Sequence, residues 1–193
     1  MLSGFGGMTW LNPPPHHVFG DGTLHVRTGK ETDFWRETFY GFRRDSGHFL
    51  CRPAEGDFSA ELTVKGEYRV LYDQAGLMVR LSETHWIKAG IEYSDGLAYV
   101  SVVVTNDNSD WSLVSIPGGP DGVRIRLTRH AEAVRVQYLD AADAHWKPVR
   151  LAYFPPSRTI DVGVMCCSPQ REGFEVTFSE FSVGPPISKN LHG

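Results

Sequence analysis

The segment FSAELTVK (residues 58–65) decides the fold class, because its apolar and polar side chains alternate at every position. Side chains of a β-strand point alternately to the two faces of its sheet, so this alternation indicates a strand with one buried face. The same pattern recurs along the chain at residues 24–26, 77–81, 87–93, 100–104, 123–127, 134–138, 160–164 and 174–178. The sequence therefore predicts an all-β protein.

The segments between these runs support a sandwich of antiparallel sheets. Turn-forming clusters occupy residues 20–22, 94–96, 117–120 and 155–157, and no stretch of helical length carries apolar residues at helical spacing. A chain of 193 residues suits one domain, because sandwiches of about 200 residues are commonly undivided. We expect the domain to span residues 10–183, with a flexible extension at 1–9 (Met8 being a possible true start) and a frayed tail at 184–193.

Composition argues against several classes of protein. The net charge is −4 and no basic run occurs, so nucleic acid is not an expected partner. No apolar stretch of about 20 residues occurs, and the N-terminus lacks a secretion signal, so no membrane association is expected. Cys51 and the adjacent Cys166 and Cys167 are an odd count that does not suit disulfides, which favours the cytoplasm. Without a phosphate-binding or dinucleotide-binding motif, or two pairs of zinc ligands, no cofactor or metal is expected.

One strand pair carries unusual side chains on its outer face. Counting by twos from Gln74 to Glu92, the outward positions include Arg80, Trp86 and Lys88, with glycines between them. A tryptophan left in water forfeits roughly 1.5–3 kcal/mol of burial free energy, so an exposed one is expected to have a partner. This face is interpreted as a shallow cleft.

Three neighbouring segments place carboxylates beside aromatic rings. Aromatic faces stack on the C–H groups of sugars, while planar polar groups bind hydroxyls, so this set suits a sugar or another bulky polar metabolite. The predicted ligand-binding residues are Asp33, Trp35, Arg36, Tyr72, Asp73, Gln74, Arg80, Trp86, Lys88, Glu92 and Trp111. A structural alternative stays open, in which tryptophans pack beneath a loop, Asp73 caps a turn, and Arg80 and Glu92 form a weak ion pair.

Several long strings also carry a family resemblance. TDFWRETFYGF (residues 32–42), YDQAGLMVR (72–80) and WIKAGIEY (86–93) resemble an uncharacterised family of concanavalin A-like domains, often labelled "regulation of enolase" after one eukaryotic member. Strings at 109–112, 150–156 and 173–181 continue the resemblance, which spans about Trp10 to Val183. It implies a jelly-roll sandwich of two antiparallel sheets, similar to legume lectins, laminarinases and the C-terminal domain of some β-xylosidases. In that architecture ligands bind the concave sheet.

Three functions follow as hypotheses. The first is a protein that binds a carbohydrate or sugar metabolite without catalysis. The second is a glycosidase-like enzyme with Asp33, Asp73 or Glu92 as acid or base; related laminarinase-like enzymes carry E-x-D-x-x-E, whereas here Glu31-x-Asp33 is followed by Arg36 in the third position. The third is a protein-interaction module, for which the family label implies the glycolytic enzyme enolase as a partner. The sequence favours the first and leaves open whether residues 30–42 form a lid.

Overall fold

The structure, a computed structural model, describes residues 2–116 and 122–191, so the turn predicted at 117–120 and the last two residues of the predicted tail lie outside it. Within the described ranges the chain forms strands and no helix. The strands are β1 (Leu2–Ser3), β2 (Thr9–Leu11), β3 (His16–Phe19), β4 (Thr23–Arg27), β5 (Phe34–Arg36), β6 (Arg43–Asp45), β7 (His48–Glu55), β8 (Phe58–Gly66), β9 (Gln74–Ser82), β10 (His85–Ser94), β11 (Leu97–Asn106), β12 (Asn108–Ser115), β13 (Val123–His130), β14 (Ala133–Asp140), β15 (His145–Tyr153), β16 (Thr159–Cys167) and β17 (Glu175–Gly184).

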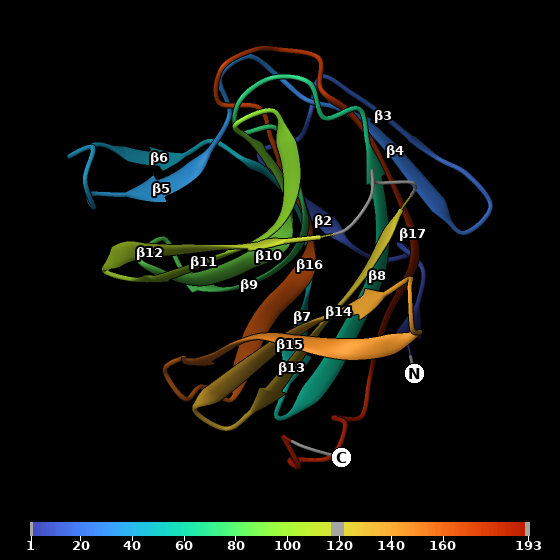
Figure 1. The fold of residues 1–193 in the computed structure, drawn as a ribbon. Helices are drawn as coiled ribbons and strands as arrows, with labels where there is room; N and C mark the ends of the chain where they lie inside the picture. Colours follow the sequence, from blue (N-terminus) through green and yellow to red (C-terminus); the bar gives the residue numbers. More distant parts are fainter. Residues whose placement is uncertain (1, 117–121, 192–193) are drawn as a thin grey trace.

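Two large antiparallel sheets form the sandwich, as the sequence predicts (Figure 1). One sheet has the order β15-β14-β13-β8-β17-β4-β3, with β1 added beside β17. The other has the order β12-β11-β10-β9-β16-β7-β2 and is called the seven-stranded sheet below. A separate hairpin, β5–β6, projects from the sandwich on the side of β12 (Figure 1). Neighbouring strands often come from distant parts of the chain, as expected for a jelly roll.

The alternating residues pack between the two sheets as expected. In β8, Phe58, Ala60, Leu62 and Val64 are all buried in the main apolar core. The seven-stranded sheet contributes the inward residues of β9 and β10 to the same core. The predicted runs therefore coincide with strands, whereas the long strands β7, β12 and β15 lie outside them. In β15 the apolar pattern is weak and contains Pro148. A proline is tolerated there because β15 is an edge strand.

The outer face of the seven-stranded sheet is covered by residues 28–47, which we call the strap. The strap contains the β5–β6 hairpin and packs over a second apolar cluster. The buried members of that cluster are Phe34, Phe49, Cys51, Met78, Trp86, Val103, Met165 and Cys167. The prediction that Trp86 is exposed on an open face is therefore wrong: its side chain is 0% exposed and its ring packs 5.9 Å from that of Phe34.

Hydrogen bonds around Ser168 attach the start of the strap to the sandwich. The Ser168 hydroxyl lies 2.6 Å from that of Thr28 and donates to the carbonyl of Gly29 at 3.0 Å. The Ser168 amide donates to the Thr32 hydroxyl at 3.1 Å. These groups are buried, where an unpaired polar atom is costly, so the bonds keep this end of the strap against the sheet.

The N-terminal residues differ from the flexible extension expected at 1–9. β1 pairs with β17, and the Gly4 amide donates to the Phe181 carbonyl at 2.9 Å. Phe5 is buried and its ring stacks on that of Phe181 at 5.7 Å. A single phenylalanine among glycines has no periodicity, so the sequence could not indicate this packing.

The described part of the C-terminal tail also contacts the sandwich. The Ile187 amide donates to the Ser59 hydroxyl at 3.0 Å, and Arg135 donates to the carbonyls of Asn190 and Leu191. Ile187, Asn190 and Leu191 therefore have bonding partners where the sequence predicts fraying.

Among the residues that the structure describes, none belongs to a helix with the length and apolarity needed to span a membrane.

Trp86→Ala tests whether the second apolar cluster, which lies beneath the strap, is part of the folded core. Removing a fully buried tryptophan is expected to lower the free energy of unfolding by about 3–5 kcal/mol. Denaturant titration of both forms measures the change. Trp111→Ala is the matched control: Trp111 is 42% exposed, and its loss should cost only about 1 kcal/mol. Equal losses in the two variants would contradict this account of the cluster.

Candidate functional site

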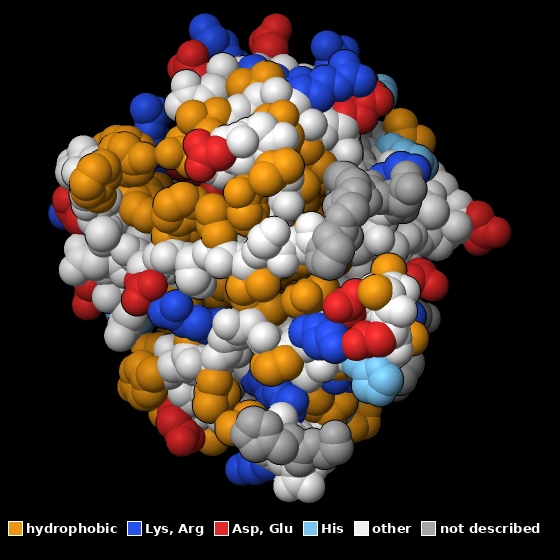
Figure 2. Space-filling view, in the orientation of Figure 1, with side chains coloured by type: hydrophobic (Ala, Val, Ile, Leu, Met, Phe, Trp, Pro, Cys, Tyr) orange, Lys and Arg blue, Asp and Glu red, His pale blue; other side chains and the backbone are white. Residues whose placement is uncertain are grey.

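A cavity of about 330 Å³ lies between the strap, the outer face of the seven-stranded sheet and two loops. The cavity lies over the outer face of the seven-stranded sheet, and the strap, rather than open solvent, forms one wall. Figure 2 shows apolar side chains gathered on this side of the molecule, where the β5–β6 hairpin and β12 lie. The lining residues are Asp33, Trp35, Tyr40, Phe42, Leu71, Tyr72, Gln74, Lys88, Glu92, Val103, Trp111, Pro169 and Gln170.

Many of the residues predicted from the sequence meet at this cavity. The structure brings together Asp33, Trp35, Tyr72, Gln74, Lys88, Glu92 and Trp111. Sequence reasoning missed Tyr40, Phe42, Leu71, Val103, Pro169 and Gln170. Tyr40 and Phe42 lie inside the string TDFWRETFYGF, so their aromatic density offered a signal. Pro169 and Gln170 have no signal in the sequence, because the contact depends on how a distant loop returns to the sheet.

Aromatic rings form the walls and the mouth of the cavity. On the hairpin, the Trp35 and Tyr40 rings meet edge-on at 6.0 Å, and the Tyr40 and Phe42 rings stack at 5.3 Å. The Tyr40 hydroxyl lies 3.0 Å from that of Tyr72, which joins the hairpin tip to the loop before β9. The pKa of Tyr72 is raised to about 12, and this hydrogen bond is the largest of the causes. Trp111 of β12 also lines the cavity.

Lys88 is the central polar group of the cavity floor. Its side chain is 4% exposed, and its ammonium donates to the Phe34 carbonyl at 2.7 Å and to Asp33 Oδ1 at 3.2 Å. The ammonium also lies 5.7 Å from the centre of the Trp86 ring, within the range of a cation–π contact. A buried charge is tolerated only when it is paired and hydrogen-bonded, and these partners satisfy that need.

Glu92 is the second ionisable group of the floor and is also buried. The Ser101 hydroxyl donates to Glu92 Oε2 at 2.8 Å. Burial raises the pKa of Glu92, while the nearby Lys88 opposes that shift. Since burial is the larger effect, the carboxyl group holds its proton to higher pH than an exposed glutamate.

Gly90 lies between Lys88 and Glu92 on β10 and adds no side chain to the floor of the cavity. A Cβ atom built on Gly90 would lie 2.1 Å from the Ala75 carbonyl oxygen, a backbone atom of the neighbouring strand. Gly90 pairs with Gly76 across β9 and β10, so two positions without side chains face each other in the ladder. The strands would have to shift to accept any larger residue at position 90, which explains the glycine.

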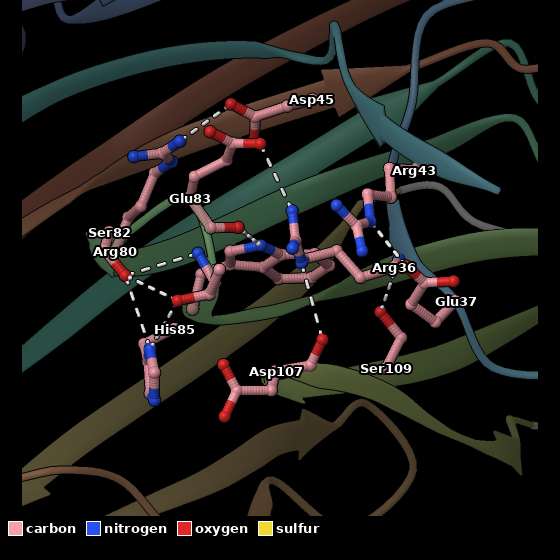
Figure 3. A network of polar contacts seen from close by, with 12 residues as sticks. Arg36, Glu37, Arg43, Asp45, Arg80, Ser82, Glu83, His85, Asp107 and Ser109 are labelled. Carbon is pink, nitrogen blue, oxygen red and sulfur yellow. Dashed lines mark hydrogen bonds and ion pairs between the residues drawn. The ribbon is translucent and has the colours of Figure 1, made fainter.

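Two of the predicted residues, Arg36 and Arg80, belong to a polar network (Figure 3) and do not line the cavity. Arg36 donates to Glu83 at 3.2 Å and to the Asp107 carbonyl at 3.4 Å. Arg80 donates to Asp45 Oδ2 at 2.8 Å, so the suggested Arg80–Glu92 ion pair is wrong. Both arginines therefore hold the hairpin and the turns together and do not reach the cavity lining.

Asp73 also has a structural role. Its carboxylate accepts hydrogen bonds from the amides of Arg69 and Val70, both at 3.0 Å. It also forms an ion pair with Arg171 at 2.6 Å. It is fully buried and does not line the cavity, which agrees with the turn-capping alternative and removes it as a candidate acid or base. Trp86 likewise lies beneath the strap and outside the lining.

The remaining chemistry-bearing groups do not add a reactive centre. Burial raises the pKa of both Cys166 and Cys167, which disfavours the reactive thiolate. Among the described residues, no three His, Cys, Asp or Glu side chains lie close enough together to hold a metal ion. The cavity offers two carboxyl groups, one ammonium, the side-chain amides of Gln74 and Gln170, and several ring faces.

Glu92→Gln tests the effect of burial on this carboxyl group. The folded protein binds the proton more tightly than the unfolded chain, so above the ordinary pKa of 4.5 the folded state carries more protons and stability falls as pH rises. Glutamine mimics the protonated acid and does not titrate. We expect the variant to match the natural protein near pH 4.5 and to have a higher unfolding temperature at pH 8.

Thermal unfolding between pH 4.5 and 8 measures this difference. Glu132→Gln is the control, because Glu132 is exposed and its substitution should leave the pH dependence unchanged. Parallel pH profiles for Glu92→Gln and the natural protein would show that the Lys88 charge offsets the cost of burial.

Comparison with known proteins identifies the family of the chain. The family model for "Protein of unknown function (DUF1349)" matches residues 10–186. A relative from Saccharomyces cerevisiae, named "Regulation of enolase protein 1", is 48% identical over 184 residues, which cover 95% of this chain and 92% of the relative. These matches confirm the resemblance seen in the sequence.

Solved structures show the same fold. A functionally unknown protein from Saccharomyces cerevisiae has a TM-score of 0.91 at 46% identity, covering 96% of this chain and 100% of that one. A legume lectin-like domain from Entamoeba histolytica has a TM-score of 0.61 at 9% identity, covering 92% and 89%. A xylan beta-1,4-xylosidase from Bacillus halodurans has a TM-score of 0.59 at 15% identity, covering 83% of this chain and 32% of that one. The last two likenesses concern the fold alone, whereas the family match spans most of the chain: this concanavalin A-like β-sandwich belongs to the DUF1349 family of proteins of unknown function.

Proposed function

We propose that the protein binds a carbohydrate or a sugar metabolite in the cavity between the strap and the seven-stranded sheet. The observation that carries the proposal is the combination of aromatic walls with a polar floor. Trp35, Tyr72 and Trp111 present ring faces or edges to a cavity whose floor contains Lys88 and Glu92. Pockets of about 300–1,000 Å³ with apolar walls and a few placed polar groups are typical of small-molecule sites.

The floor has unused hydrogen-bonding capacity that suits sugar hydroxyls. An ammonium has three N–H donors, and the bonds of Lys88 to Asp33 and Phe34 leave one of them available. The Gln74 amide nitrogen donates to the Tyr72 carbonyl at 3.2 Å, which leaves its oxygen as an acceptor. A sugar hydroxyl both donates and accepts, so it can use mixed partners of this kind.

The fold supports the proposal by analogy. A legume lectin-like domain shares the architecture, as does one part of a xylan beta-1,4-xylosidase. We also retain the expectation of a cytoplasmic location. The three free, buried cysteines support it, because a reducing compartment keeps thiols unpaired.

Trp111→Ala tests the proposed binding. A thermal-shift screen of the natural protein against monosaccharides, oligosaccharides and sugar phosphates is expected to find a stabilising sugar class. A ligand at about 100 times its dissociation constant adds roughly 2.7 kcal/mol, which corresponds to several degrees in a domain of this size. The variant should lose that shift, because it lacks one wall of the cavity, while its unliganded unfolding temperature changes little.

Tyr153→Ala is the matched control for this experiment. Tyr153 is a similarly exposed aromatic residue, but it lies on β15 of the other sheet. It should keep the full ligand shift. A screen in which no sugar stabilises the natural protein would contradict the proposal and favour a protein partner, for which the name of the yeast relative suggests enolase.

A glycosidase-like enzyme is the second candidate function. Two carboxyl groups, Asp33 and Glu92, line one cavity, and burial raises the pKa of Glu92, as a general acid requires. Release of nitrophenol from aryl glycosides would reveal the activity. If it is present, Glu92→Gln should lower kcat by at least about 100-fold, because general acid catalysis contributes 10²–10⁴-fold. An unchanged rate in both Glu92→Gln and Asp33→Asn would exclude this pair as the catalytic groups.

A further inference from the structure

The charges around the cavity restrict which sugars it can accept. Among the described residues that line the cavity, Lys88 is the one cationic side chain, and it faces the two carboxyl groups of Asp33 and Glu92. The Lys88 ammonium is already bonded to Asp33 Oδ1 and to the Phe34 carbonyl. The cavity therefore has no cation free to pair with an incoming anion.

Arginines near the cavity do not supply the missing charge. Arg171 is paired with Asp73, Arg80 with Asp45, and Arg36 with Glu83. Arg44 lies 5.3 Å over the ring of Phe42 and does not line the cavity. An anionic ligand would have to share the Lys88 ammonium with Asp33, whose carboxylate already balances its charge.

Those partners belong to the strap, so moving Lys88 has a structural cost. Both Asp33 and Phe34 lie in the strap, and their bonds to Lys88 hold it against β10. A sugar phosphate carries about 1.5–2 negative charges near pH 7. It would meet the Asp33 and Glu92 carboxyl groups at close range, and like charges placed together repel each other.

From this arrangement we propose that the cavity selects uncharged sugars and rejects their phosphorylated and carboxylated forms, with Asp33 as the residue that enforces the selection. The inference rests on the proposed function, which it narrows to one ligand class. Asp33 acts in two ways: it is bonded to the Lys88 ammonium, and it places a negative charge where a phosphate would lie. Specificity gained by repelling the wrong ligand is a recognised device in proteins.

Asp33→Asn isolates the effect of the charge. An asparagine oxygen can still accept a hydrogen bond from Lys88, so the strap keeps a partner at this position while one negative charge is removed. The freed ammonium charge then becomes available to a phosphate. The preference of the natural protein for a neutral sugar over its phosphate is expected to fall by at least about tenfold in the variant, the equivalent of about 1.4 kcal/mol.

The experiment is isothermal titration with matched pairs of probes. Glucose, galactose, mannose and xylose are each compared with the corresponding sugar phosphate, and glucose and galactose also with their uronic acids. Asp110→Asn is the matched control, because it makes the same charge change on an exposed residue that pairs with Arg150 and does not line the cavity. Its preference should equal that of the natural protein. Glu92→Gln is a second test variant, which removes the other lining carboxyl group and should reduce the preference in the same direction.

Each outcome decides a separate point. A neutral sugar that binds the natural protein more tightly than its phosphate, together with a reduced preference in Asp33→Asn but not in Asp110→Asn, supports the inference. A phosphate that binds the natural protein as tightly as the neutral sugar overturns it and leaves the proposed sugar binding intact. A preference that is unchanged in both Asp33→Asn and Glu92→Gln overturns the role of the carboxyl groups. Absence of binding by every probe overturns the proposed function itself.

Discussion

The buried ammonium group of Lys88 is the constraint on which the candidate site depends. A charge taken out of water must be paired and hydrogen-bonded, and the partners available on this face are the Asp33 carboxylate and the Phe34 carbonyl of the strap. Through those partners the strap is held over the outer face of the sheet, where Phe34 covers Trp86. The cavity exists because the strap lies there. Lys88 of β10 therefore has two effects: it balances the charge of Asp33, and it holds in place the strap that carries the aromatic residues.

The sequence was sufficient for the architecture because alternation is a local signal. Runs such as 58–65 and 87–93 became strands of the sandwich with the predicted faces inward. The same counting indicated that Lys88 and Glu92 share a face, and both line the cavity. What alternation cannot show is whether a face is covered. Trp86 points outward from the sandwich as counted, yet it is buried by a segment some fifty residues earlier in the chain.

The remaining errors at the site have the same physical origin. A charged residue in the sequence carries no mark of its partner, and the partners of Asp73 and Arg80 lie far along the chain at Arg171 and Asp45. Each of these pairs fastens a loop or the hairpin, so the charges that looked available for a ligand are already neutralised. The residues left without such a fastening role, including Gln74 and Trp111, are those on which the functional proposal concentrates.

The division of the apolar interior into two clusters has a consequence for cooperativity. The larger cluster lies between the sheets, whereas the smaller one holds only the strap to the outer face. Segments that bury little apolar surface open in sub-global steps at lower free energy than the whole domain. The strap should therefore exchange its amide hydrogens faster than the strands beneath it. On heating, the cavity would be lost while the sandwich is still intact, so the working temperature range of the protein would be set by its smaller core.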